Sequence, residues 1–283
     1  MGANVKAIRN RIRSVESTMH ITKAMELVAS SKLRHATERM EHSRFFFETL
    51  VASFSDFGEG IAESSFAPRK EVRRRALVVI AGDRGLAGGY NNNVFKTVAA
   101  ESSDGLPYVV LPIGKKAGEH FRRRGIELLC DKVPTLEGFS MDDCAEAGRL
   151  LAEGYRRGDF DEVKLVFTDY ITLLSQNPAV LPLLPLKPPP KDGAKTGPHA
   201  ETIYDPSAAA VLDAITPEYL SGMIYGAVCE SHTSELAARR TAMDAASKNA
   251  GEMIDDLSLR YNRARQSAIT QEITEIIGGS EQQ

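Results

Sequence analysis

Residues 8–50 read IRNRIRSVESTMHITKAMELVASSKLRHATERMEHSRFFFETL. Alternating steps of four and three residues select a mostly apolar set: Ile8, Ile12, Val15, Met19, Thr22, Glu26, Ala29, Leu33, Ala36, Met40, Ser43, Phe47 and Leu50. This spacing is typical of a coiled-coil seam. No proline interrupts residues 4–56, so the pattern predicts one helix of about 50 residues, about 75 Å long. Compact domains do not contain helices of this length, so the helix must pair with another segment.

The seam has two polar members, Thr22 and Glu26. A second apolar run, formed by Ile21, Met25 and Val28, lies beside them. We therefore expect the buried face of the helix to rotate at this point, which is how a coiled coil absorbs a stutter in its repeat.

A second seam runs along the C-terminal residues. It consists of Met243, Ser247, Ala250, Ile254, Leu257, Tyr261, Ala264 and Ala268, followed after a one-residue shift by Ile269, Ile273 and Ile276. Pro217 suits the first turn of this helix, and Gly278-Gly279 suits its end. One amphipathic helix this long cannot bury its stripe alone. We expect the two terminal helices to pair, antiparallel because a whole domain separates them.

The middle of the chain has a different period. Short apolar and β-branched runs predict strands at 76–81, 108–113, 126–129 and 163–167, with helices between them near 93–101, 115–124 and 141–157. This alternation predicts a Rossmann-like α/β domain with a mainly parallel sheet. A proline-rich run follows and leads into residues 188–200, which we expect to form a mobile loop.

The expected fold class is therefore α/β, with a long antiparallel two-helix coiled coil joined to a central α/β domain. The predicted division of the chain is an N-terminal coiled-coil helix at 1–57, a linker at 58–75, the α/β domain at 76–205 and a C-terminal coiled-coil helix at 206–283.

Composition excludes several classes of protein. The 283 residues carry a net charge of -3, which argues against a generally basic nucleic-acid coat protein. No apolar run approaches the ~18 residues of a membrane span, and the charged N-terminus lacks the apolar core of a secretory signal. Cys130, Cys144 and Cys229 form no CxxC pair, so we interpret them as reduced thiols in a reducing compartment.

The strongest enzyme-like feature is the glycine turn, residues 82–89, with the sequence GDRGLAGG. It follows the first predicted strand and precedes a helix, where α/β folds bind phosphates. However, neither GxxxxGK[ST] nor GxGxxG is present, and HExxH and GxSxG are also missing. We favour a turn in which glycines allow positive φ and close packing, with no cofactor and no metal. The candidate site residues of this turn are Asp83, Arg84, Gly85, Gly88 and Gly89.

The N-terminal helix is locally basic. Its cations outnumber its acids and include Lys6, Arg9, Arg11, Arg13, Lys23, Lys32, Arg34, Arg39 and Arg44. Three interpretations stay open: a solvated face of a coiled coil, a basic collar that passes an acidic protein surface, and nucleic-acid binding. Aromatic residues do not alternate with these cations before Phe45, which disfavours stacking on single strands.

Three stretches together resemble one known family. They are residues 21–33 (ITKAMELVASSKL), 83–91 (DRGLAGGYN) and 261–276 (YNRARQSAITQEITEI). They resemble the gamma subunit of F-type ATP synthase, in the right order and across the whole chain. His20 and Ala87 depart from the usual family residues, Lys and Cys. No cysteine-bearing insertion of the chloroplast kind is present, which favours the bacterial type.

The resemblance implies a non-catalytic rotor shaft that couples transmembrane proton flow to ATP synthesis or hydrolysis. Its implied partners are the ring of three alpha and three beta subunits, the epsilon subunit and the membrane c-ring, without nucleic acid and without homo-oligomerisation. It implies a peripheral location on the cytoplasmic face of the bacterial plasma membrane.

The resemblance also implies contact residues. Lys23 and Met25 fall where the family's shaft meets the lower lobes of beta, and Arg265 and Gln266 fall at the beta catch loop. Arg239 matches another coupling position. Met25 as coiled-coil core and Arg239 as a solvated cation are the simpler alternatives.

Two other classes of function compete with the rotor. An α/β nucleotide-binding enzyme with helical appendages is disfavoured by the missing phosphate-loop lysine. A generic coiled-coil adaptor would form a stable self-dimer, whereas the rotor pairs its own two helices within one chain.

Overall fold

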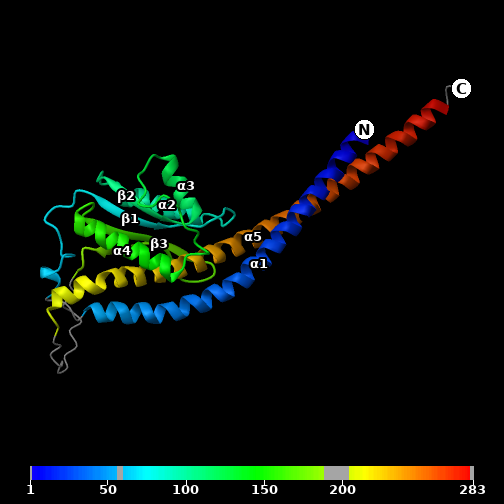
Figure 1. Ribbon diagram of the computed structural model, residues 1–283. Helices are drawn as coiled ribbons and strands as arrows, with labels where there is room; N and C mark the ends of the chain where they lie inside the picture. Colours follow the sequence, from blue (N-terminus) through cyan, green and yellow to red (C-terminus); the bar gives the residue numbers. More distant parts are fainter. Residues whose placement is uncertain (1, 56–59, 188–203, 281–283) are drawn as a thin grey trace. The chain divides into compact units, whose positions relative to one another are not determined.

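The computed structural model describes residues 2–55, 60–187 and 204–280, so the loop expected at 188–200 lies outside the described residues. Figure 1 shows the order of the elements, which are α1 (Gly2–Ser55), a short 3₁₀ helix η1 (Gly60–Glu63), β1 (Arg75–Ile80), α2 (Tyr90–Glu101), β2 (Tyr108–Ile113), α3 (Lys115–Arg123), α4 (Met141–Arg157), β3 (Glu162–Tyr170), β4 (Gln176–Leu184) and α5 (Ala208–Ser280). The chain forms two compact units, one of Met1–Ser31 with Arg239–Gln283 and one of Lys32–Ala238.

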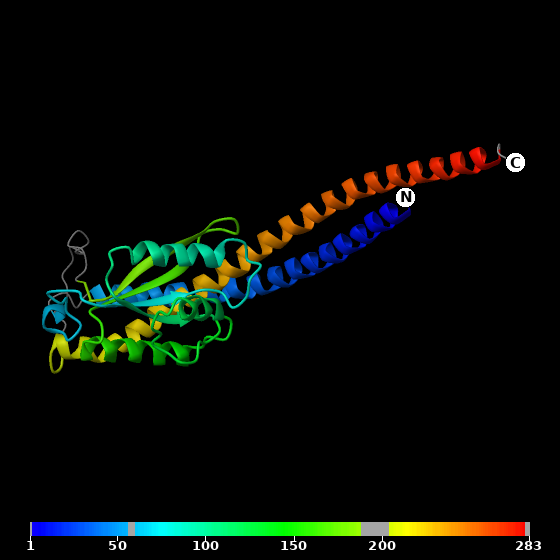
Figure 2. The ribbon, with the colours of Figure 1, turned by 90° about the horizontal axis from the view of Figure 1, so that it is seen from above.

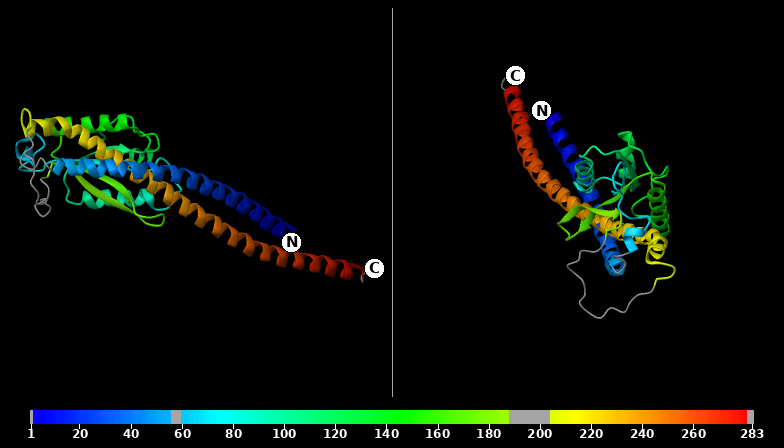
Figure 3. Two further views of the ribbon diagram at one scale, coloured as in Figure 1. Left: turned by 90° about the horizontal axis from the view of Figure 1, so that it is seen from below. Right: turned by 90° about the vertical axis from the view of Figure 1, so that its left-hand side faces the viewer.

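The first unit is a pair of antiparallel helices, built from the start of α1 and the end of α5. Both chain termini lie at the same end of the pair (Figures 2 and 3). The predicted seams account for its inward side chains. Met243, Ala250 and Leu257 are buried, and Ile8, Ile12, Val15 and Met19 are half-buried. The predicted antiparallel coiled coil is confirmed.

The predicted rotation of the buried face of α1 is wrong. Ile21 and Val28 are 58% and 56% exposed, whereas Thr22 and Glu26 are half-buried and stay in the seam. Thr22 keeps its place because its hydroxyl finds a hydrogen-bonding partner, Ser247, on α5. A polar seam residue with such a partner has a small desolvation cost, so the buried face of α1 does not rotate at this point.

The predicted one-residue shift near the end of α5 is also wrong. Ala268 and Gln271 continue the half-buried stripe, while Ile269 and Ile273 are exposed. The side chains of Phe47, Leu50 and Ile276, which the sequence assigned to the seams, lie outside the described residues. The helix continues through Gly278-Gly279 and ends at Ser280.

The second unit is built on a four-stranded sheet with the order β2-β1-β3-β4. β1 is central and fully buried, and pairs parallel with both β2 and β3. α2 and α3 cover one face, where Val94, Val98 and Phe121 pack on Leu77 and Val79 of β1. α4 and the first part of α5 cover the other face (Figure 1). The predicted Rossmann-like domain with a mainly parallel sheet is confirmed.

Two strand predictions need correction. Residues 126–129 form a single parallel bridge, Val110 to Leu128, and no strand. The sequence missed β4, which pairs antiparallel with β3 and contains Pro178 and Pro182. Proline has no backbone N–H and cannot donate a hydrogen bond to a neighbouring strand, so within sheets it occurs mainly on edge strands. β4 is an edge strand.

The predicted place of Pro217 in the first turn of the C-terminal helix is wrong, because α5 begins at Ala208 and Pro217 lies inside it. Proline has no N–H, so the carbonyl of Asp213, four residues earlier, lacks its helical donor. Arg156 of α4 donates to that carbonyl instead. Gly148 allows the close approach, since a Cβ there would lie 2.5 Å from the Pro217 carbonyl oxygen. A neighbouring helix thus stabilises the proline.

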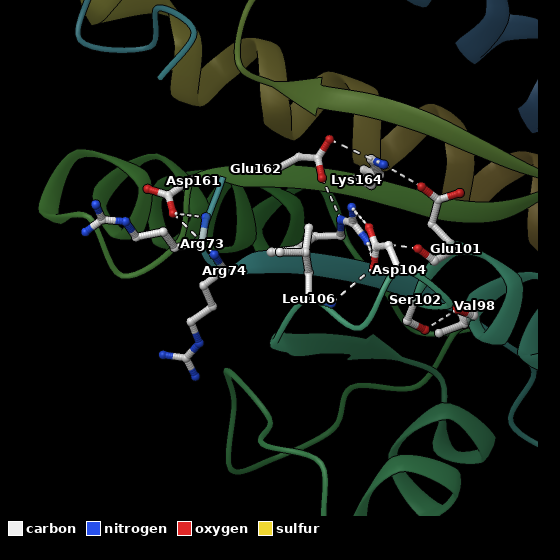
Figure 4. Close-up of polar contacts among 11 residues, drawn as sticks. Arg73, Arg74, Val98, Glu101, Ser102, Asp104, Leu106, Asp161, Glu162 and Lys164 are labelled. Atoms are coloured by element: carbon white, nitrogen blue, oxygen red, sulfur yellow. Dashed lines mark hydrogen bonds and ion pairs between the residues drawn. The ribbon is translucent and has the colours of Figure 1, made fainter. Parts of the chain in front are cut away.

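A charged cluster joins the amino ends of β1 and β3 (Figure 4). The buried Arg75 donates from Nε to Glu162 Oε2 at 2.5 Å and from Nη2 to Asp104 Oδ2 at 2.8 Å. Lys164 pairs with Glu162 at 3.3 Å and with Glu101. Open α/β sheets bind ligands at the carboxyl ends of their strands, so this cluster at the opposite end serves to hold β1, β3 and α2 together.

Candidate functional site

The glycine turn lies at the carboxyl end of β1, where an α/β enzyme would hold a phosphate. Asp83 fills this position with its own carboxylate. Its Oδ1 accepts hydrogen bonds from the backbone N–H of Lys115 at 3.1 Å and of Leu136 at 3.0 Å, and its Oδ2 accepts one from Glu137 N–H at 3.2 Å. In an anion-binding site, backbone amides such as these, including that of Lys115 at the start of α3, would donate to the anion. The turn therefore connects β1 to α2, and the Asp83 carboxylate places negative charge where a phosphate would bind.

Two glycines of the turn have a clear physical reason. A Cβ at Gly82 would lie 2.5 Å from Glu235 Oε1 of α5, and Gly88 has a φ of 56°. The Gly82 amide donates to Asn91 Oδ1 at 2.8 Å, which closes the turn. Gly85 has open space around its Cα and Gly89 has a φ of -84°, so other residues fit sterically at both positions.

Leu86 and Arg84 are the outward members of the same turn. Leu86 adopts a φ of 64°, a left-handed conformation that is uncommon for a residue with a Cβ. Both side chains are exposed. The turn therefore places an apolar and a cationic side chain on the surface.

All five contact residues named by the resemblance lie in the helix pair, at separate levels. Lys23 is exposed and pairs with Glu26 at 2.9 Å, and Met25 is half-buried. Both lie near the level at which Thr22 contacts Ser247. Arg265 and Gln266 are exposed about five turns further along α5, and Arg239 is half-buried about two turns before Ser247. The structure thus yields a series of levels along a rod and does not bring these residues into one site.

The last turns of α5 carry two different faces. One is a shallow polar groove lined by Arg263, Gln266, Ser267, Thr270, Gln271 and Thr274. Beside it, the spacing of four residues puts Ile269, Ile273 and Ile277 on one exposed apolar stripe. The resemblance indicated Gln266, whereas the seam prediction wrongly included Ile269 and Ile273, because they follow the seam after a one-residue shift. Ile277 was not part of that prediction. α1 has a comparable exposed apolar set, Ile21, Leu27 and Val28.

The cysteines are free thiols in this fold. Burial raises the pKa of the Cys144 thiol to about 12 and also raises the pKa of Cys130 and Cys229. Reactive cysteines need a lowered pKa, so these three are poor nucleophiles at neutral pH.

Within residues 2–55, 60–187 and 204–280, no group of three or more His, Cys, Asp or Glu side chains could hold a metal ion. Across the same ranges, none of the helices is both long and apolar enough to cross a membrane.

Comparison with known proteins identifies the family. The ATP synthase family model matches residues 4–282. The chain is 46% identical to the ATP synthase gamma chain of Ruminococcus albus, with 98% of each chain covered. This chain belongs to the ATP synthase gamma chain family. It is also 39% identical to a gamma chain of Acetobacterium woodii described as sodium ion specific, with 99% of each chain covered.

Solved structures of ATP synthases share the fold of this gamma-family chain. A chain of the Euglena gracilis mitochondrial enzyme aligns with a TM-score of 0.66 at 17% identity, covering 98% of this chain and 94% of that one. A chain of the Tetrahymena thermophila central stalk and c-ring aligns with a TM-score of 0.63 at 21% identity, covering 80% and 99%. The predicted family and function, a gamma subunit that forms the rotor shaft of ATP synthase, are confirmed.

Proposed function

We propose that this chain carries out its rotor function by mechanical coupling alone, with no catalytic residue of its own. The observation that supports this most directly is the helix pair, which carries polar and apolar side chains exposed at several levels along its length. The occupation of the anion position by Asp83 further supports a connecting role for the α/β domain.

The proposed partners follow from the relatives. The similar solved chains come from complexes described as a central stalk with c-ring and as an F1 with c-ring. By analogy, the helix pair of this chain passes through a ring of alpha and beta subunits, and its α/β domain contacts the epsilon subunit and the c-ring. The complex lies on the cytoplasmic face of a bacterial plasma membrane, with this chain peripheral to it.

We assign the functional parts of the chain accordingly. Residues 1–57 and 206–283 form the shaft, residues 76–205 form the foot, and residues 58–75 link them. The foot turn residues are Asp83, Arg84, Gly85, Gly88 and Gly89. Among them Asp83 keeps the start of α3 in place through the hydrogen bonds described above, and Gly88 supplies the positive φ of the turn.

The contact residues act at two levels of the ring. The exposed Arg265 gives directed, charge-assisted bonds to a carboxylate of beta, and the Gln266 amide adds a neutral polar contact. Lys23 and Met25 meet the lower lobes of beta, where Lys23 is partly neutralised by Glu26. Arg239 acts between these levels and the foot.

The coupling itself follows from symmetry. An asymmetric rod inside a ring with threefold pseudo-symmetry contacts each beta subunit through a different face. A conformational change can be driven only by contacts that differ in free energy between the two states. Rotation therefore moves each catalytic site through its states in turn, while the coupling ion is selected by other subunits.

Affinity purification of the tagged chain from its own cells tests this proposal. We expect two P-loop ATPase subunits in threefold excess over the chain, with ATPase activity in the complex and none in the chain alone. Recovery of the chain alone with bound nucleotide or catalytic activity would contradict the proposal and return attention to the glycine turn.

A further inference from the structure

The carboxyl end of β3 is fastened to α5 through side chains. β1 runs beside β3 as far as Val79 opposite Val166, and β3 continues to Tyr170. Beyond that point the Thr168 N–H donates to Ser231 Oγ at 3.1 Å, and the Tyr170 N–H donates to Glu230 Oε2 at 3.0 Å. Residues two apart in a strand direct their amides to the same edge, so α5 side chains continue the pairing where β1 stops.

Glu230 also holds α1. Its Oε1 accepts hydrogen bonds from Arg44 Nε at 3.1 Å and Arg44 Nη2 at 2.9 Å. The Glu230 side chain is 13% exposed and that of Arg44 is 49% exposed, so solvent screens this ion pair from the Arg44 side. One carboxylate on α5 thus joins α1 to the last residue of β3. We call the contact of Arg44, Glu230 and the Tyr170 amide the Glu230 clamp.

Packing around the clamp is incomplete. A cleft of 320 Å³ lies among α1, the sheet and α5, and its lining includes Ser43, Arg44, Phe167, Leu181, Met223 and Glu230. Close packing normally fixes a helix against a sheet, and a void forfeits those contacts. At this level the polar clamp adds to the packing of α1, whose Met40 is buried one turn away from Arg44.

A neighbouring contact does not duplicate the clamp. Arg39 of α1 donates to the Tyr225 hydroxyl at 3.1 Å and lies over its ring at 5.2 Å. This contact links α1 to α5, because both of its residues belong to these helices. About three turns closer to the N-terminus than Arg44, α1 contacts the α/β domain directly through Lys32 Nζ and Glu137 Oε1, which lie 2.5 Å apart.

We propose that Glu230 is a positioning residue for torque transfer, which locks α1 to the α/β domain so that both shaft helices turn with it. This inference rests on the proposed rotor function. Torque that enters through the α/β domain reaches α5 directly by its packing on the sheet, but it reaches α1 at this level through Glu230. Without the clamp, α1 keeps its contacts nearer the N-terminus, including the Lys32–Glu137 ion pair, but it is free to twist at the level of Arg44. Part of the rotation is then lost before it reaches the ring.

The test uses the complete ATP synthase in inverted membrane vesicles. The quantity measured is the ratio of ATP-driven ion pumping to ATP hydrolysis, per assembled complex. We expect Glu230→Ala to lower this ratio by about twofold or more, because charge-assisted bonds to two elements are lost. Glu230→Gln, which can still accept from the Tyr170 amide, is expected to give an intermediate value.

Arg44 provides a rescue series that separates torque transfer from assembly. Arg44→Ala should lower the ratio, and Arg44→Lys, which restores the charge, should recover most of it. Glu153→Ala removes a carboxylate of an exposed ion pair on α4 and serves as the matched control with an unchanged ratio. If Glu230→Ala does not assemble, the Arg44 series alone decides.

Single-molecule measurement adds a mechanical readout. The angular fluctuation of a probe fixed to the α/β domain, in a complex with a stalled ring, should widen in Arg44→Ala and narrow again in Arg44→Lys. Ratios and fluctuations in the Arg44 and Glu230 variants equal to those of the wild type and of Glu153→Ala would overturn the clamp. A wild-type complex that hydrolyses ATP without pumping would instead contradict the proposed function.

Discussion

Thr22 Oγ1 of α1 and Ser247 Oγ of α5 lie 2.8 Å apart across the seam of the helix pair. The Thr22 hydroxyl also donates toward the Met19 carbonyl within its own helix. A polar pair at a seam position favours one register of two helices, because a shift would separate the half-buried Ser247 hydroxyl from Thr22. The contact therefore sets which residue of α1 faces which residue of α5.

This pair predicts a non-additive effect on stability. Thr22→Val keeps the shape and leaves the Ser247 hydroxyl without its partner, so we expect a loss of about 1 kcal/mol. The double variant Thr22→Val, Ser247→Ala should lose less than the sum of the two single variants. Thermal unfolding of the purified chain, followed by circular dichroism, measures the three values. Additive losses would show that the two hydroxyls are not coupled.

The seam of α5 predicts that the same substitution has different effects on folding at two leucines. Leu257 is 8% exposed and Leu259 is 61% exposed. Leu257→Asp buries an unpaired charge and should separate the helix pair, lowering helicity and preventing assembly with the ring. Leu259→Asp is the matched control and should leave the helicity of the isolated chain unchanged. Full helicity and assembly in Leu257→Asp would refute the assignment of the seam.

The exposed residues near the end of α5 predict a defect in coupling without a defect in folding. Arg265→Ala combined with Gln266→Ala should lower coupled ATP turnover, while the α/β domain keeps its unfolding temperature. Arg260→Ala removes a cation that is already paired with Asp256 at 2.9 Å, and it should have a smaller effect. Unchanged turnover in an assembled complex of the double variant would count against a contact with beta.

Asp161 predicts a dependence of stability on pH. Burial acts to raise the pKa of its carboxyl, but hydrogen bonds from the Arg73 and Arg74 amides and from Arg69 outweigh burial and lower that pKa (Figure 4 shows the two amides). A depressed folded-state pKa means that the stabilisation is present above the unfolded value of about 3.9 and is lost as pH falls through the folded value.

Asp161→Asn therefore tests this pH dependence directly. At neutral pH it should lower the free energy of unfolding by about 1–3 kcal/mol, since bonds to a charged acceptor are weakened. The difference from the wild type should stay constant above about pH 5 and shrink below pH 4. Denaturant unfolding between pH 3 and 7 provides the measurement. A difference that grows on acidification would have the wrong sign.

The local and periodic parts of the fold could be predicted from the sequence. α4 begins and ends where the pattern indicated, because Ser140 and Asp143 form a capping box and Gly158 ends the helix in a left-handed conformation. The terminal helices were visible in the same way, since a seam of four-three spacing is a property of consecutive residues.

The parts that depend on distant partners could not be predicted. β4 was not predicted, because its prolines indicate a loop unless the strand is known to lie at the edge of the sheet. Pro217 lies inside a helix because Arg156, far away in the sequence, supplies the missing donor. The Glu230 clamp joins residues 186 positions apart, and no local pattern encodes such a contact.

For the contact residues, too, the sequence indicated the positions but not the contacts of the side chains. The resemblance identified Lys23, Arg265 and Gln266 by motif, but it did not indicate that Lys23 is engaged by Glu26 while Arg265 is exposed. Those properties follow from the side chains' neighbours in the folded chain.

We expect this chain to rotate as a unit inside its ring while the ring hydrolyses ATP. The most direct measurement attaches a probe to the α/β domain in a complex whose ring is fixed to a surface, and supplies ATP. We predict rotation in one direction with three equal steps per revolution, which follows from the threefold pseudo-symmetry proposed for the ring. A probe that stays fixed while the same complexes hydrolyse ATP would contradict the account.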